Sequence, residues 1–142
     1  MMTAKTVFSR STARPGLLAL LTGVLLASAA GCAGNGLPEG TWAVTAVEGR
    51  DLVDGSEPSV TFDGGDVLIR TGCNPINGTA HYSHDILSVP DGATTLVGCD
   101  AALSAQEQWL GELFATGVRL SLDGETMTLS QDDVTLTLER QR

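Results

Sequence analysis

The sequence predicts a mainly β domain (α+β), built as a small antiparallel barrel-like sheet of about eight strands with one covering α-helix. Short apolar stretches alternate with polar residues along most of the chain after residue 40, which is the period of half-buried strands. Gly-containing turn signals separate these stretches. One stretch, 104–116, has helical spacing instead.

The first expected strand covers residues 41–47, where Trp42, Val44 and Ala46 share one face. The sequence Asp-Gly-Gly-Asp at 63–66 predicts a hairpin turn between two further strands. The remaining signals in this half predict strands at 59–63, 67–70, 79–84, 86–89 and 94–97, and turns at 74–78 and 91–92.

The last third of the chain has the clearest alternation, which predicts a three-stranded meander. Tight turns at 123–125 and 131–133 separate its strands. The expected buried residues are Val118, Leu120, Leu122, Met127, Leu129, Val134, Leu136 and Leu138. Threonines between them suit a solvated face, so the opposite face must be covered.

The expected helix, residues 104–116, begins at a capping box formed by Ser104 and Glu107 and ends at Gly117. Its apolar stripe consists of Trp109, Leu110, Leu113 and Phe114. This spacing favours packing against the sheet over a platform for a ligand.

The first 31 residues are typical of a lipoprotein signal peptide. Lys5, Arg10 and Arg14 precede an apolar run at 17–30, and small residues lead to Cys32. The run is shorter than a spanning helix needs, although an uncleaved anchor is an alternative. We expect a flexible tether at 32–39 and one domain at 40–142.

Cys32 is the expected lipidation site. A thiol that carries a diacylglycerol, preceded by small residues that a peptidase accepts, would hold the protein at the extracytoplasmic face of the cell membrane. The competing interpretation is ordinary secretion with a free Cys32. The membrane, reached through this lipid anchor, is the one partner that the sequence indicates.

Charge argues against nucleic acid as a partner. All 17 acidic residues but only five of the eight basic ones come after residue 31, so the mature chain has a net charge of −12. Such a surface repels phosphate backbones and anionic lipid head groups. Membrane contact would therefore depend on the covalent anchor.

Two cysteines remain if Cys32 is acylated, namely Cys73 and Cys99. Outside the cytoplasm they can form a disulfide; two buried free thiols are the alternative. Cys73, between Gly72 and Asn74, also resembles a nucleophile turn with a histidine as base. Asn74 and Gly78 are better interpreted as turn residues with positive φ.

No metal or cofactor site is expected. His81 and His84 are three apart on a strand and would face opposite sides, and zinc needs three or four converging ligands. The acidic turns at 63–66 and 132–133 lack the ligand number of a calcium loop. Asn77-Gly78-Thr79 matches a glycosylation sequon, which we interpret as chance.

The order of several short motifs resembles the META domain of HslJ-type heat-shock proteins. The matching stretches, which span residues 40–138, are Gly40-Thr41-Trp42, Val47-Glu48-Gly49, 58–62, Gly72-Cys73-Asn74, Asn77-Gly78, Tyr82, 94–99, Gln106-Glu107 and 124–129. The family's residues before its second cysteine are here replaced by Val97-Gly98.

The resemblance implies a compact barrel-like β domain with one helix and pairing of Cys73 with Cys99. It also implies a non-enzymatic protein linked to stress and to tolerance of the antibiotic novobiocin, with no catalytic residues to carry over. The alternative function is a carrier that binds a small apolar ligand inside the barrel. A packed interior would argue against this alternative.

Overall fold

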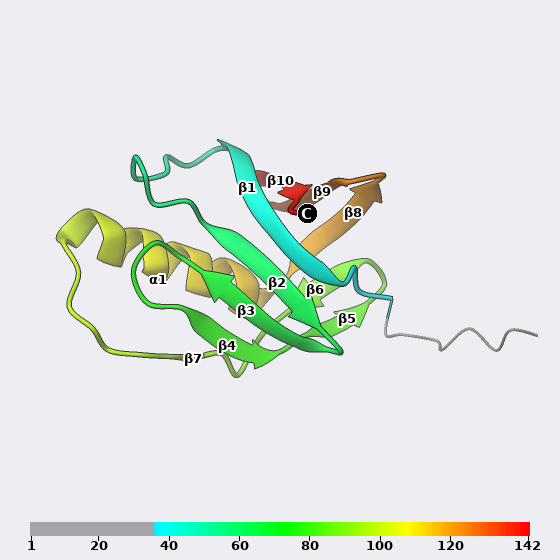
Figure 1. The fold of residues 1–142 in the computed structure, drawn as a ribbon, viewed down its shortest axis with the longest axis horizontal. Coiled ribbons are helices and arrows are strands. Elements are labelled where there is room, and N and C mark those ends of the chain that lie inside the picture. Colours follow the sequence, from blue (N-terminus) through cyan, green and yellow to red (C-terminus); the bar gives the residue numbers. More distant parts are fainter. Residues whose placement is uncertain (1–35) are drawn as a thin grey trace, which may run out of the picture. The chain divides into compact units, whose positions relative to one another are not determined.

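The structure, a computed structural model, describes residues 36–142. These residues form ten strands and one helix (Figure 1). The elements are β1 (Gly40–Glu48), β2 (Ser59–Asp63), β3 (Asp66–Arg70), β4 (Ile76–Thr79), β5 (His81–Ser83), β6 (Ile86–Ser88), β7 (Ala93–Thr94), α1 (Ala101–Thr116), β8 (Val118–Asp123), β9 (Thr126–Gln131) and β10 (Val134–Arg140). The predicted fold class is confirmed, with ten strands instead of about eight.

All ten strands belong to one sheet, in the order β5-β6-β8-β9-β10-β1-β2-β3-β4-β7, and every neighbouring pair is antiparallel. β4 and β5 lie near opposite ends of this order, yet Ala80 alone separates them in the chain. The sheet must therefore curl around until these two strands meet. The amide of Ala80 donates to the carbonyl of Gly65 (2.8 Å) at this corner.

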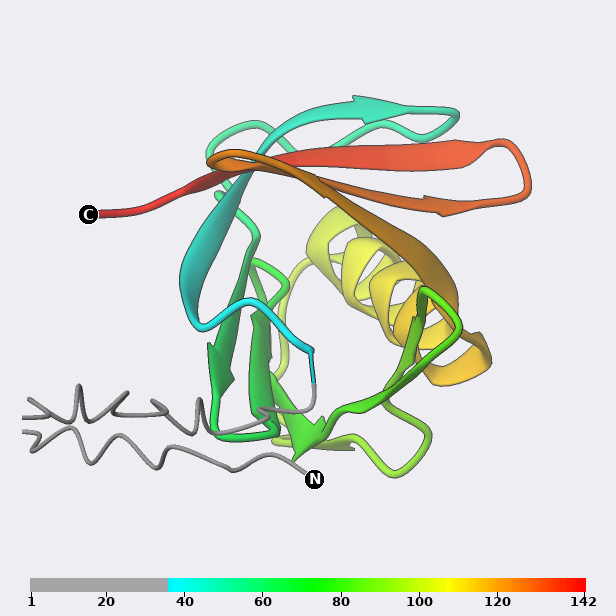
Figure 2. The same ribbon diagram turned by 90° about the vertical axis from the view of Figure 1, so that its right-hand side faces the viewer.

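Figure 2 shows the curled sheet with α1 lying across its open side. Apolar side chains from both layers fill the space between them and include three very large ones, Trp42, Phe62 and Phe114, each about 1% exposed. Leu110, Leu113 and Phe114 are buried, and Trp109 is half-buried against the same core. The predicted apolar stripe of the helix therefore covers the core.

The alternation in the last third of the chain is confirmed for all of its expected core positions except one. β8, β9 and β10 pair in the expected meander, and each inward position is buried apart from Leu122, which is 46% exposed. Leu122 lies one residue before the end of β8.

In β1, the expected face of Ala46 is wrong. The register with β10 shifts between Val44 and Ala46, which marks a β-bulge. A bulge adds one residue to a strand and so reverses the facing of the residues after it. Val47 consequently packs against the core, while Ala46 is exposed.

The helix begins three residues earlier than the sequence predicted. Asp100 is the N-cap, and its Oδ1 accepts a hydrogen bond from the amide of Leu103 (2.9 Å). Ser104 and Glu107 therefore do not form a capping box, because Ser104 already lies inside the helix. The C-terminal end agrees with the prediction, since Gly117 ends α1 with φ 107° and donates to the carbonyl of Leu113.

The turn predicted at 74–78 is also wrong, because β4 begins at Ile76. Gly78 has no positive φ; it is needed for close packing, since a Cβ there would lie 2.7 Å from Cγ1 of Val89. The positive φ of this region belongs to Gly72, at 94°. By contrast, Gly64 and Gly65 form the predicted hairpin turn and both have positive φ.

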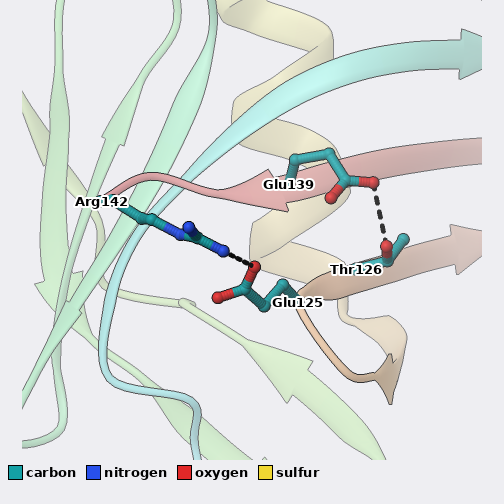
Figure 3. Close-up of polar contacts among 4 residues, drawn as sticks. All are labelled: Glu125, Thr126, Glu139 and Arg142. Carbon is teal, nitrogen blue, oxygen red and sulfur yellow. Dashed lines mark hydrogen bonds and ion pairs between the residues drawn. The ribbon is translucent and has the colours of Figure 1, made fainter.

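Both ends of the described chain are held to the sheet. Leu37, which the sequence placed in the tether, is buried, and the guanidinium of Arg140 donates to the carbonyl of Glu39 (3.0 Å). Near the C-terminus Arg142 pairs with Glu125 at 2.8 Å, and Thr126 donates to Glu139 at 2.9 Å (Figure 3). The ion pair is exposed, so we assign it little stability.

The predicted signal peptide and Cys32 lie outside the described residues. Within residues 36–142, no helix has the length and apolar character needed to cross a membrane.

Candidate functional site

The loop after β3 and the loop before α1 are joined by a disulfide between Cys73 and Cys99, whose Cα atoms lie 6.1 Å apart. The bond closes a separation of 26 residues. Both sulfurs are used in this bond, so the structure contains no thiolate at Cys73 that could act as a nucleophile.

Asn74 is the centre of a polar cluster beside this disulfide. Its side chain is buried, with 5% exposure of the residue, and Nδ2 donates to the carbonyl of Val97 and to Oε2 of Glu107, both at 3.0 Å. Its Oδ1 accepts from the hydroxyl of Thr95 (2.6 Å) and from the amide of Val97 (3.0 Å). The side chain thus acts as a bridge between three segments of the chain.

Gln106, one turn into the helix, likewise joins separate segments of the chain through its side-chain amide. It is 2% exposed, its Nε2 donates to the carbonyl of Thr71 (2.6 Å), and its Oε1 accepts from the amide of Val53 (2.7 Å). The Thr71 hydroxyl in turn donates to the carbonyl of Asn74 (2.8 Å). These bonds satisfy backbone groups in loops that no strand pairs, which is the usual requirement for burying them.

The cluster holds an apolar tip at the surface, which we define as Leu96 and Val97. Leu96 is 95% exposed and Val97 is 67% exposed. Asn74 binds both the amide and the carbonyl of Val97, and the disulfide follows two residues later. The sequence predicted this stretch as part of a strand, but β7 ends at Thr94. Two adjacent apolar side chains are therefore exposed on a backbone that Asn74 holds at Val97.

The histidines lie elsewhere. His81 is on β5, whereas His84 occupies the turn between β5 and β6 with φ 51°, so the expectation that both are on one strand is wrong. Both are exposed. Between them, the hydroxyl of Tyr82 donates to Oδ1 of Asp85 (3.4 Å); burial and the charge of Asp85 raise the pKa of Tyr82 above its ordinary 10.0.

No group of three or more potential metal ligands occurs among residues 36–142. The acidic turns contribute to hairpins instead. Asp63 and Asp66 flank the β2–β3 turn, and Asp132, with φ 51°, lies in the β9–β10 turn. Asn77 of the sequon is on β4 and exposed.

Sequence reasoning missed the roles of Asn74, Gln106 and the apolar tip. For Gln106 a signal existed, because it precedes Leu110 by four residues and so interrupts the buried stripe of the helix with a polar group. Asn74 and the tip offered no comparable pattern, since their contacts join loops that are distant in sequence.

A single antiparallel sheet, curled into a half-barrel and covered by one helix, with a disulfide between two of its loops, defines the class of protein. The META domain matches residues 35–142, so the chain belongs to the META domain family. No curated protein matches it.

Two solved structures support the fold. An NMR structure of a protein from Burkholderia xenovorans is 17% identical, with a TM-score of 0.63, and the match covers 98% of this chain and 99% of the other. A second NMR structure is 21% identical, with a TM-score of 0.61, and covers 73% of this chain and 91% of its own. At these identities the likeness concerns the fold alone.

Proposed function

We propose that this META domain protein is a lipid-anchored, non-enzymatic binding protein of the cell envelope that acts through contacts made by its apolar tip. The exposure of Leu96 and Val97, on a backbone held by Asn74, is the observation that carries the binding role. Two adjacent exposed apolar side chains gain free energy when a partner removes them from water. Holding them in place beforehand lowers the entropy lost on binding.

Two features favour binding over catalysis. The cysteine that resembles a nucleophile is bonded to Cys99. The buried polar side chains around it, Asn74 and Gln106, direct their polar atoms to groups within the fold. The carrier alternative gains no support from the interior, where the inward-facing apolar side chains form one packed cluster.

The anchor is supported by the sequence before the domain. Four residues lie between Cys32 and Leu37, the first buried side chain of the described chain. An extended chain covers about 3.5 Å per residue. A lipid on Cys32 would therefore hold the domain within about 20 Å of the membrane surface.

Intact mass spectrometry of the protein extracted from host membranes tests the anchor. We expect a chain that begins at Cys32, carries acyl mass and lacks two hydrogens. The Cys32→Ala variant should be lost from the membrane fraction. The double variant Cys73→Ser with Cys99→Ser keeps Cys32 and should remain in that fraction. A full-length, unacylated chain in the soluble fraction would refute the anchor.

The role of the tip is tested by complementation of a deletion strain under heat and novobiocin. The double change Leu96→Ser with Val97→Ser should keep the fold and the anchor yet fail to restore survival. Leu122→Ser, which alters another exposed leucine, is the matched control and should restore it. A deletion strain that survives like wild type, or full complementation by the tip variant, contradicts the proposal.

A further inference from the structure

A second surface, separate from the apolar tip, has the composition of a ligand site. Three segments converge on it: the loop just after the end of β1, the C-terminal half of α1 and the β9–β10 turn. They enclose a cleft of about 360 Å³, which we call the Trp109 cleft. Its lining consists of Arg50, Trp109, Glu112, Leu113, Thr116, Gln131, Asp132, Asp133 and Val134.

One wall of the Trp109 cleft is apolar. Trp109 is half-buried, so part of its indole packs on the core while part lines the cleft. Leu113 and Val134 beside it are buried and belong to the core. A partly exposed indole backed by fixed apolar side chains offers a rigid surface for the C–H face of a flat, partly apolar ligand.

Two polar side chains of the rim, Gln131 and Glu112, are held by hydrogen bonds to neighbouring groups. Nε2 of Gln131 donates to the hydroxyl of Thr116 (2.7 Å) and to the carbonyl of Gly117 (2.6 Å), and neither bond uses the Oε1 of Gln131. Oε1 of Glu112 accepts from Gln108 (3.2 Å). Groups that are already oriented lose less entropy when a ligand binds.

The turn that supplies the two aspartates is fixed by a close backbone approach. Gly49, with φ 80°, packs so tightly that a Cβ would overlap the carbonyl oxygen of Asp133. The neighbouring residue, Arg50, lines the same cleft. The contact therefore fixes the backbone that carries the guanidinium relative to the acidic turn across the opening.

The charges narrow the class of ligand. Three carboxylates and one guanidinium give the rim a net negative charge, which disfavours phosphate, carboxylate and other anionic ligands. The many polar groups disfavour a purely apolar ligand, because they would lose water without gaining a partner. A ligand with one apolar face and several hydroxyl or amino groups at its edge would fit both the apolar wall and the polar rim.

We propose that the Trp109 cleft binds a saccharide, either neutral or carrying an amino group. The indole contacts the apolar face of one sugar ring, and the carboxylates, the guanidinium and the Gln131 amide oxygen bind its hydroxyl groups. This site does not depend on the lipid anchor, so binding can be measured even if the anchor is refuted.

Fluorescence and calorimetry of the full protein test the proposal with defined probes: chitotriose, maltotriose, xylotriose and the glucosamine trimer. The chain has two tryptophans, and Trp42 is 1% exposed, so a fluorescence change on binding would report on Trp109. We expect a Kd in the millimolar range for at least one probe, as is usual for a small polar ligand in a shallow site.

The variants separate binding from folding. Asp132→Asn with Asp133→Asn should weaken binding about tenfold, because hydrogen bonds to charged groups are stronger than bonds between neutral ones. The matched control, Asp63→Asn with Asp66→Asn, changes another acidic hairpin turn and should bind like wild type. Trp109→Phe should bind more weakly and lose the fluorescence signal.

Two outcomes would overturn the proposal. One is that no probe binds by calorimetry at about 50 mM, well above the millimolar Kd expected. The other is that binding is unchanged in the Asp132 and Asp133 variant or equally weakened in the control. Either result would exclude saccharide binding in this cleft while leaving the role of the apolar tip intact.

Discussion

Changing Asn74 to aspartate replaces one NH₂ group by an oxygen and keeps the shape of the side chain. That group donates to the carbonyl of Val97 and to the carboxylate of Glu107, each at 3.0 Å. In the variant, a carboxylate oxygen would face these two acceptors inside the fold. The change therefore converts two attractions into two repulsions at a residue that is 5% exposed.

Leaving a buried charge without its partner lowers the free energy of unfolding by about 3–5 kcal/mol, and we expect about 4 kcal/mol at pH 7. The domain of 107 residues, 36–142, has an unfolding entropy near 0.22 kcal/mol/K, so the Tm should fall by about 18 °C. Thermal unfolding followed by circular dichroism measures this change.

Acid should reduce the loss. Burial and Glu107 raise the pKa of the introduced aspartate in the folded state, so its protonated form, which can donate again, is retained to higher pH. The protonated side chain therefore stabilises the folded variant fully at a pH below about 4, the ordinary pKa of aspartate. This contribution to the free energy of unfolding is lost as the pH rises through the raised pKa of the folded state. The control is Asn77→Asp, an equal charge change at an exposed position of β4, expected within about 0.5 kcal/mol of wild type. A loss at Asn74 below about 1 kcal/mol, or one that does not shrink at about pH 4 relative to wild type, would refute the reasoning.

Three further predictions concern other elements. Changing Cys73 and Cys99 to serine should lower the free energy of unfolding by about 3.5 kcal/mol in urea titrations, the chain entropy of a 26-residue loop; an equally stable variant would contradict this. The Gly49→Ala variant should lose more stability than the Gly55→Ala variant. Both glycines have positive φ, but only a Cβ at position 49 would overlap backbone, at Asp133. Equal urea midpoints of the two variants would show that this close approach is unimportant. Tyr82, the sole tyrosine, should titrate above pH 10 by its absorbance at about 295 nm, and stability should fall as the pH rises through that pKa; titration at or below 10 would be inconsistent with its burial.

The regular parts of this fold could be predicted because local periodicity determines them. The meander from β8 to β10 follows from its alternation, and the apolar stripe of α1 follows from helical spacing. The turn at Gly64 and Gly65 follows from the conformational freedom of glycine.

The errors occurred where a long-range contact changes a local pattern. The β-bulge after Val44 depends on the register with β10, more than 90 residues away. Residues 74–78 have the composition of a turn, yet pairing with β3 makes Ile76 the start of a strand. Asn74 likewise gains its role from Val97 and Glu107, which the sequence does not place beside it.

The pairing of β1 with both β2 and β10 has a consequence for how the chain matures. The first strand finds one neighbour early, but its other neighbour is the last strand to be synthesised. Contacts between the two ends of a chain form late and make folding slow. We expect chains that lack β10 to leave the sheet open along β1, and the curled sheet to be completed only when β10 pairs with β1.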